Sequence, residues 1–137
     1  MLYIIIGLPA SGKTTYYHNE LNELSHLKFY DDFITTFFDN ELIEDLEAGI
    51  DLCITDPRLC DINRFRDYMK LFNNYVKKED IKLIIFKNNP ENCLLNAGKR
   101  NKKRVEKTIE MYSKIYNPEL YKDDGYTIVK IIDVLCN

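Results

Sequence analysis

Eight residues near the start of the chain combine two glycines, a lysine and a threonine at a spacing suited to phosphate binding. Residues 7–14 read Gly-Leu-Pro-Ala-Ser-Gly-Lys-Thr and match G-x-x-x-x-G-K-[ST]. In such a loop, backbone N–H groups converge on phosphate oxygens, the lysine adds positive charge toward the β- and γ-phosphates, and the threonine hydroxyl is a Mg²⁺ ligand. The alternative interpretation is a Gly-Lys turn between a strand and a helix. We predict phosphate binding by these residues and the next one: Gly7, Leu8, Pro9, Ala10, Ser11, Gly12, Lys13, Thr14 and Thr15.

Carboxylates follow two other β-prone segments. Asp31 and Asp32 come after residues 27–30, and Asp56 comes after residues 51–55. The carboxyl ends of parallel strands meet at one edge of a sheet, so these side chains are expected near the phosphate loop. Asp31 suits a general base, with Asp32 as the N-cap of the helix that follows. Asp56 suits a carboxylate near the Mg²⁺, although an Asp before a Pro also starts turns.

A strongly basic segment lies in the second half of the chain. Residues 99–107 hold six Lys and Arg against one Glu, whereas residues 18–60 hold 11 acids against two bases. Arg100 and Arg104 are four residues apart, so on a helix both project from one face and can grip the same triphosphate. The alternative is a solubilising or nucleic-acid-binding patch.

The elements that must position these residues alternate along the chain. Strands are expected at residues 2–6, 27–30, 51–55, 81–86 and 126–132. Between them, apolar residues recur at helical spacing: from Leu21 to Leu24, from Phe33 to Leu46 with a C-cap at Ala48-Gly49, from Ile62 to Val76 after an Asp61 N-cap, after Asn89-Pro90, and from Val105 to Tyr116 before Asn117-Pro118. This order predicts an α/β fold: a parallel sheet of about five strands with helices on both faces.

Length and composition set further bounds. A chain of 137 residues with 45% hydrophobic and 30% charged residues is expected to form one globular domain, residues 1–137. Its apolar runs are too short for a membrane helix, and four widely spaced cysteines favour buried thiols over a metal site. A net charge of −3 by itself predicts neither nucleic-acid nor membrane binding. These features point to the cytoplasm, or to the host cytoplasm if the protein is viral.

Taken together, the motifs resemble the bacteriophage polynucleotide 5′-hydroxyl kinase family, within the small P-loop kinases. The resemblance runs in order along nearly the whole chain: the loop at 7–14, Asp31-Asp32-Phe33, Ile54-Thr55-Asp56, Asn63-Arg64-Phe65-Arg66, the segment 100–104 as an arginine-bearing lid, and Met111-Tyr112-x-Lys114. There are two departures. Ile34 stands where the family has an Arg that contacts the phosphate of the nucleic acid, and Ala10 replaces a common loop glycine.

The resemblance implies a P-loop NTPase fold with a basic lid at about residues 97–107, and an enzyme that is a phosphotransferase with an alcohol acceptor. By that likeness, Lys13 and Thr14 bind ATP and Mg²⁺, Asp31 activates the acceptor, and Arg100 and Arg104 engage the transferring phosphates. The expected acceptor is the 5′-hydroxyl of single-stranded DNA or RNA. Two alternatives stay open: a P-loop kinase for a nucleoside or sugar, and a non-catalytic ATP-binding interaction protein.

Overall fold

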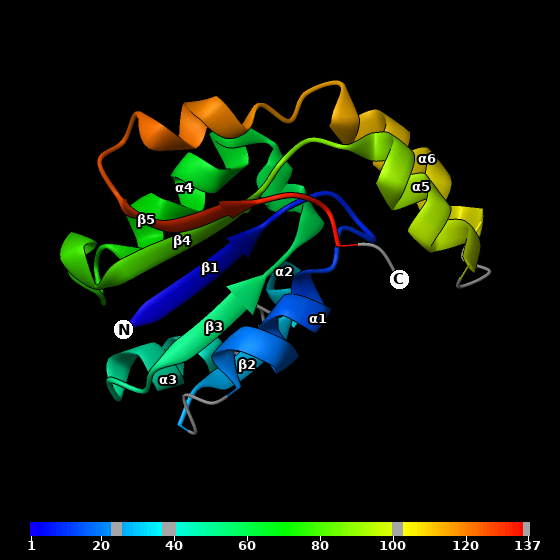
Figure 1. Ribbon diagram of the computed structural model, residues 1–137. Helices are drawn as coiled ribbons and strands as arrows, with labels where there is room; N and C mark the ends of the chain where they lie inside the picture. Colours follow the sequence, from blue (N-terminus) through cyan, green and yellow to red (C-terminus); the bar gives the residue numbers. More distant parts are fainter. Residues whose placement is uncertain (23–25, 37–40, 100–102, 136–137) are drawn as a thin grey trace.

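Five parallel strands form the centre of the protein in a computed structural model that describes residues 1–22, 26–36, 41–99 and 103–135 (Figure 1). The strands lie in the order β2-β3-β1-β4-β5. Their bounds are β1 Leu2–Ile6, β2 Lys28–Asp31, β3 Leu52–Thr55, β4 Ile81–Phe86 and β5 Thr127–Ile132. The predicted α/β class and the five predicted strands are therefore confirmed, each strand to within one residue at either end.

Burial along each strand agrees with its central or edge position in the sheet. The continuous apolar runs of β1, β3 and β4 are almost wholly buried, as expected for strands covered on both faces. The edge strands β2 and β5 are partly exposed, and β5 leaves Val129 and Ile131 in contact with solvent. The amino-acid pattern thus separates central strands from edge strands.

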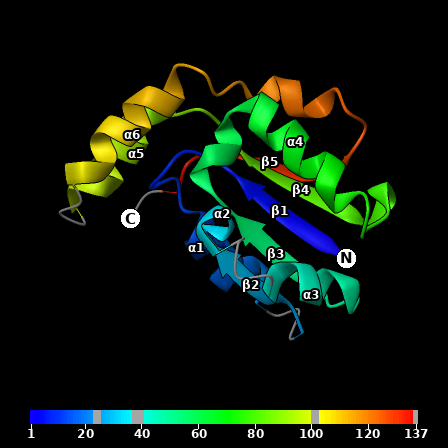
Figure 2. The same cartoon turned by 180° about the vertical axis from the view of Figure 1, so that it is seen from behind.

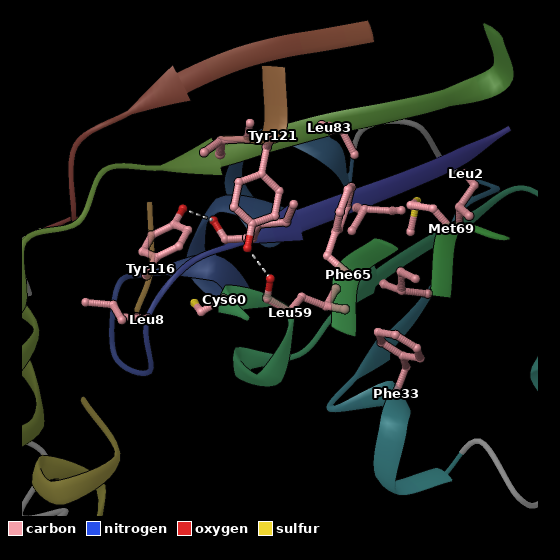
Figure 3. Packing of buried hydrophobic residues seen from close by; sticks show 14 of the residues in the cluster. Leu2, Leu8, Phe33, Leu59, Cys60, Phe65, Met69, Leu83, Tyr116 and Tyr121 are labelled. Carbon is pink, nitrogen blue, oxygen red and sulfur yellow. Dashed lines mark hydrogen bonds between the residues drawn. The ribbon is translucent and has the colours of Figure 1, made fainter. Parts of the chain in front are cut away.

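The larger core lies on the face of the sheet that Figure 2 turns toward the viewer. It is covered by α3 (Glu41–Glu47) and α4 (Ile62–Phe72). Here Leu2 and Ile4 of β1 belong to the same buried cluster as Phe65 of α4 and Tyr121 of the 3₁₀ helix η5 (Pro118–Lys122). The Phe65 and Tyr121 rings meet edge to face with centroids 4.8 Å apart. In Figure 3 the Tyr121 hydroxyl points at the Leu59 carbonyl, to which it donates a hydrogen bond.

The opposite face is covered by a shorter helical segment. This segment begins as α1 (Lys13–Tyr16) and continues as a π-helix, η1 (Tyr17–Leu21). Its Tyr16 and Leu21 pack against Ile5 and Phe86 in a second, smaller core. Helices therefore cover both faces of the sheet, as predicted.

Three helices differ from the sequence pattern. The stripe from Ile62 to Val76 predicts a longer helix than α4, which ends at Phe72. The stripe from Phe33 to Leu46 predicts one helix, whereas the structure has α2 (Phe33–Thr36) and α3, with residues 37–40 outside the described ranges. The last stripe predicts a helix through Tyr116, but α6 (Lys103–Ser113) ends earlier. The Asn88 amide donates to the carbonyls of Ser113 and Tyr116, at 2.8 and 2.9 Å, and so satisfies acceptors that further helix would otherwise pair.

Other predicted helix ends are confirmed. Asp61 caps α4 by accepting the Asn63 N–H at 3.0 Å, and Gly49 ends α3 with φ +73°. The helix α5 (Pro90–Lys99) begins with proline at its first position, after Asn89. With α6 it forms a helical hairpin that projects beyond the carboxyl edge of the sheet (Figure 1).

The strand order places a switch point between β1 and β3. The connection that leaves β1 passes through α1 on one face, whereas the connection that leaves β3 passes through α4 on the other. Ligands of open α/β sheets bind in the crevice outside the carboxyl ends of the strands at such a point. The loop 7–12 and Asp56 both lie there, directly after β1 and β3.

Candidate functional site

The glycine-rich loop, residues 7–12, has two glycines at positions where a side chain would clash with its neighbours. Gly12 has φ +103°, and a Cβ placed on it would lie 2.8 Å from the Leu135 Cβ. A Cβ on Gly7 would lie 2.7 Å from the Ser11 Oγ and 2.9 Å from the Phe86 Cβ. Ala10 also has a positive φ of 62°, where glycine is the usual residue. The loop therefore packs closely against Phe86 of β4 and against Leu135 in the segment after β5.

Lys13 lies folded against this loop. Its side chain is only 7% exposed, and the Nζ donates to the carbonyls of Gly7 at 2.9 Å and Leu8 at 2.7 Å. Burial lowers the pKa of Lys13, while the nearby negative charges of Asp31 and Asp32 act in the opposite direction. Both acceptors of the Lys13 Nζ are neutral carbonyls. An anion bound in the loop would give the buried ammonium group a partner of opposite charge.

A cavity of about 470 Å³ opens beside the loop. Four separate parts of the chain line it: the loop with the start of α1, the end of β2, the residue after Asp56, and the start of α6. The lining residues are Pro9, Ala10, Gly12, Lys13, Thr14, Thr15, Asp31, Asp32, Pro57, Arg104, Val105 and Thr108. Residues predicted to bind phosphate, to act as a base and to supply positive charge thus border one space.

Most of the residues singled out in the sequence meet in this cavity. Lys13, Thr14, Asp31 and Arg104 line it, whereas Leu8 and Ser11 are fully buried and do not line it. Arg100 lies outside the described residues, so its placement stays a prediction.

The two adjacent aspartates differ in their surroundings. Asp31 ends β2 and pairs in register with Thr55, while Asp32 adopts φ +48°, a left-handed conformation that Asp tolerates better than most residues. Loss of hydration raises the pKa of Asp32, and the charges of Asp31 and Asp56 raise it further. The site therefore holds two neighbouring carboxyl groups, of which Asp32 retains its proton more readily than an ordinary Asp.

Asp56 is fully buried, and both of its oxygens accept hydrogen bonds. Its Oδ1 accepts the Arg58 backbone N–H and Nε, both at 2.9 Å. Its Oδ2 accepts the Arg58 Nη2 at 2.8 Å and the Ile34 backbone N–H at 3.2 Å. Direct coordination of Mg²⁺ by Asp56 stays a prediction, and it requires that the cation displace one of these donors.

Side chains for a metal are sparse elsewhere. Among the described residues, no three or more His, Cys, Asp or Glu side chains come together as a metal site. A cation at the cavity would therefore take oxygen ligands from bound phosphates, water and a hydroxyl such as that of Thr14, as Mg²⁺ commonly does.

Cys53, Cys60 and Cys93 are buried free thiols, and burial raises the pKa of Cys93 to about 11. Within the described ranges, no helix has the length and apolar character to cross a membrane.

Three contributors were missed by the sequence analysis. Arg58 holds Asp56, and Asn96 of α5 donates to the carbonyls of Ala10 and Leu135 at 2.9 and 2.6 Å. Leu135 in turn donates its N–H to the Ser11 carbonyl at 3.0 Å. The signal for Asn96 is its place beside Cys93 and Ala97 on the buried side of α5, where an amide needs partners.

Comparison with known proteins gives a sequence relative and no activity. No protein-family model matches the chain. A curated but uncharacterized protein of Acanthamoeba polyphaga mimivirus is 39% identical over 130 residues, which cover 93% of this chain and 94% of the relative. The similarity therefore extends over most of both chains.

Proposed function

Because the chain belongs to one family with this uncharacterized mimivirus protein, whose name assigns no activity, we propose a function from the site itself. We propose that the protein is a P-loop kinase that transfers the γ-phosphoryl group of ATP to a hydroxyl, with the 5′-hydroxyl of single-stranded DNA or RNA as the acceptor. The observation that carries the proposal is the shared cavity of Lys13, Asp31 and Arg104 at the switch point of the sheet. We further propose that it acts in the cytoplasm, that of the host cell if the chain is viral.

The donor phosphates fit the glycine-rich loop. Its backbone follows a buried strand and opens a helix, and Gly12, Lys13 and Thr14 at the amino end of α1 line the cavity, as a phosphate site at a helix start requires. Lys13 already lies over the loop, so a modest rotation of its side chain carries the ammonium from two carbonyls to the phosphates. Mg²⁺, when bound with ATP beside Thr14, would neutralise charge on the phosphates.

The acceptor hydroxyl fits the opposite side of the cavity, at the end of β2. Asp31 is exposed there and can accept the proton of an attacking hydroxyl. Asp32 lines the same cavity, and its raised pKa places a second group that can hold a proton beside the acceptor. In the transfer, the acceptor oxygen forms a bond to the γ-phosphorus, the bond from that phosphorus to the β-γ bridging oxygen breaks, ADP leaves, and Asp31 takes the hydroxyl proton.

Arg104 fits the role of a cation over the moving phosphoryl group. It projects from the first turn of α6 and is exposed, yet it lines the same cavity as Lys13. Charge on the phosphoryl oxygens is stabilised by such groups, and closure of the helical hairpin would bring Arg104 nearer. Arg100 stays the second candidate for this role.

The nucleic-acid acceptor is supported by Arg58, which supplies a guanidinium group beside the position of Ile34. Arg58 donates to the Thr35 Oγ1 at 2.8 Å and is held by Asp56. Burial raises the pKa of Tyr112, and the nearby charges of Arg64 and Arg58 partly offset this rise. A guanidinium group and an aromatic side chain in this part of the protein would suit a phosphate and a stacked base of the acceptor.

The proposal is tested by transfer of label from γ-labelled ATP with Mg²⁺. The acceptors are a short oligonucleotide with a 5′-hydroxyl, the same strand already 5′-phosphorylated, and a panel of nucleosides and sugars. Label on the hydroxyl strand alone supports the proposal. Label on a small metabolite alone replaces it with the metabolite kinase, and ATP binding without transfer to any acceptor replaces it with the interaction protein.

Salt provides an independent check of the acceptor. Oligonucleotide binding that depends on phosphate contacts weakens as salt rises, because condensed counterions are released on binding. A neutral nucleoside or sugar shows little such dependence.

A further inference from the structure

Asn96 makes an unusual set of contacts for a residue in the middle of a helix. Its side chain is only 2% exposed, and its two amide hydrogens go to carbonyls of different segments, Ala10 in the glycine-rich loop and Leu135 after β5. These partners are 86 and 39 residues away along the chain. One buried amide therefore joins α5, the glycine-rich loop and the segment after β5.

The carbonyl that Asn96 holds belongs to a strained residue. Ala10 has φ +62°, and a non-glycine residue persists in that region only when its surroundings enforce it. The hydrogen bond to the Ala10 carbonyl fixes the peptide unit between Ala10 and Ser11, whose N–H donates to the Leu8 carbonyl at 3.2 Å. Loss of this bond frees the loop to relax toward negative φ at Ala10.

Leu135 completes the arrangement. Its N–H donates to the Ser11 carbonyl, its own carbonyl accepts from Asn96, and its side chain packs over Gly12. Asn96 thus holds the loop directly through Ala10 and indirectly through Leu135.

We propose that Asn96 is a positioning residue that holds the glycine-rich loop in its phosphate-accepting conformation and couples that loop to the helical hairpin α5–α6. The inference rests on the proposed function for its ligand, since the bound phosphates are those of ATP. The coupling follows from location: Asn96 lies on α5, and Arg104 lies on the partner helix α6. The side chain of Asn96 therefore links the hairpin directly to the loop.

The test compares Asn96→Ala with Asn92→Ala, a change one turn earlier on the same helix. Among the hydrogen bonds described for the chain, none links the Asn92 side chain to the loop. The readouts are the affinity for Mg-ATP and for inorganic tripolyphosphate by calorimetry, the KM and kcat for ATP, and hydrogen exchange of the loop amides. Asn96→Ser serves as a second variant in case the alanine variant does not fold.

We expect Asn96→Ala to weaken Mg-ATP and tripolyphosphate binding by about tenfold and to speed exchange of the loop amides by a similar factor, as loss of well-formed hydrogen bonds implies. KM for ATP should rise more than kcat falls. Asn92→Ala should leave all of these values near those of the wild type.

Ala10→Gly provides a rescue that a purely structural role would not give. Glycine adopts positive φ without the hydrogen bond from Asn96. Ala10→Gly should therefore raise the phosphate affinity of Asn96→Ala by more than it changes the affinity of the wild type. Equal effects of Ala10→Gly in both backgrounds, or unchanged affinity in Asn96→Ala, would overturn the inference. A wild type that binds neither probe would refute the proposed function, while loop exchange equal in wild type and Asn96→Ala would separately refute the role of Asn96.

Discussion

The Asp56 carboxylate, just after β3, accepts a hydrogen bond at 3.2 Å from the backbone N–H of Ile34, in the first turn after β2. This bond ties the turn that carries Asp31 and Asp32 to the switch point of the sheet. Arg58 holds the same carboxylate from the other side through three hydrogen bonds. A buried carboxylate therefore braces this edge of the cavity.

Arg58→Met should destabilise the protein, because it leaves a buried carboxylate without its cation. We expect a loss of about 3 kcal/mol in the free energy of unfolding, the usual cost of breaking a buried ion pair from one side. Urea denaturation measures this loss. The matched control is Arg66→Met, whose pair with Asp124 is partly exposed and should contribute less than about 1 kcal/mol. Equal losses in the two variants would contradict the role assigned to Asp56.

Gly12→Ala should disrupt the glycine-rich loop. The new Cβ would lie 2.8 Å from the Leu135 Cβ at a residue with φ +103°, so we expect a loss of about 1–3 kcal/mol and weaker ATP binding. Gly98→Ala in α5 is the control, since no atom lies within 4 Å of its Cβ position. That change should instead stabilise the protein by about 0.5–1 kcal/mol through helix propensity. A neutral Gly12→Ala in thermal denaturation would refute the close packing of Leu135.

Asp32→Asn should stabilise the protein at neutral pH and have little effect in acid. The pKa of Asp32 is raised above 3.8 in the folded state, so the folded protein holds this proton more tightly than the unfolded chain. Its favourable contribution is complete below the unfolded pKa and is lost as pH rises through the folded pKa. Asn is also tolerated at φ +48°, so the substitution changes mainly the charge.

Melting temperatures of wild type and Asp32→Asn at about pH 3.5 and about pH 7 check this prediction. The variant should melt higher only at the neutral pH. A stabilising effect of equal size at both pH values would point to packing and not to charge.

Much of the fold follows from local patterns in the sequence. The β-branched runs at 2–6 and 81–86 are strands because an apolar segment of that length is best buried between helices in a parallel sheet. Lys13 and Asp31 meet in one cavity because parallel strands place the residues that follow them at one edge. These conclusions need only periodicity and the geometry of the sheet.

The remaining features depend on contacts between distant residues. The apolar stripe predicts a helix through Tyr116, whereas α6 ends at Ser113, where the Asn88 amide binds the carbonyls of Ser113 and Tyr116. Asn88 lies outside the helix, so the pattern within the helix does not predict this contact. Asn96 reaches Ala10 across 86 residues, which local spacing does not reveal. Asp56 is held by Arg58, two residues later, and by the N–H of Ile34, contacts that an Asp-Pro pair does not reveal, and its place beside Mg²⁺ stays a prediction.

The central claim is tested most directly by the rate of γ-phosphoryl transfer from ATP to a 5′-hydroxyl oligonucleotide in Asp31→Asn, under single-turnover conditions. Asp67→Asn, on the exposed side of α4, is the control. If Asp31 is the base, Asp31→Asn binds Mg-ATP like the wild type but transfers at least about 100-fold more slowly, as removal of a general base implies. Full transfer by Asp31→Asn would contradict the account.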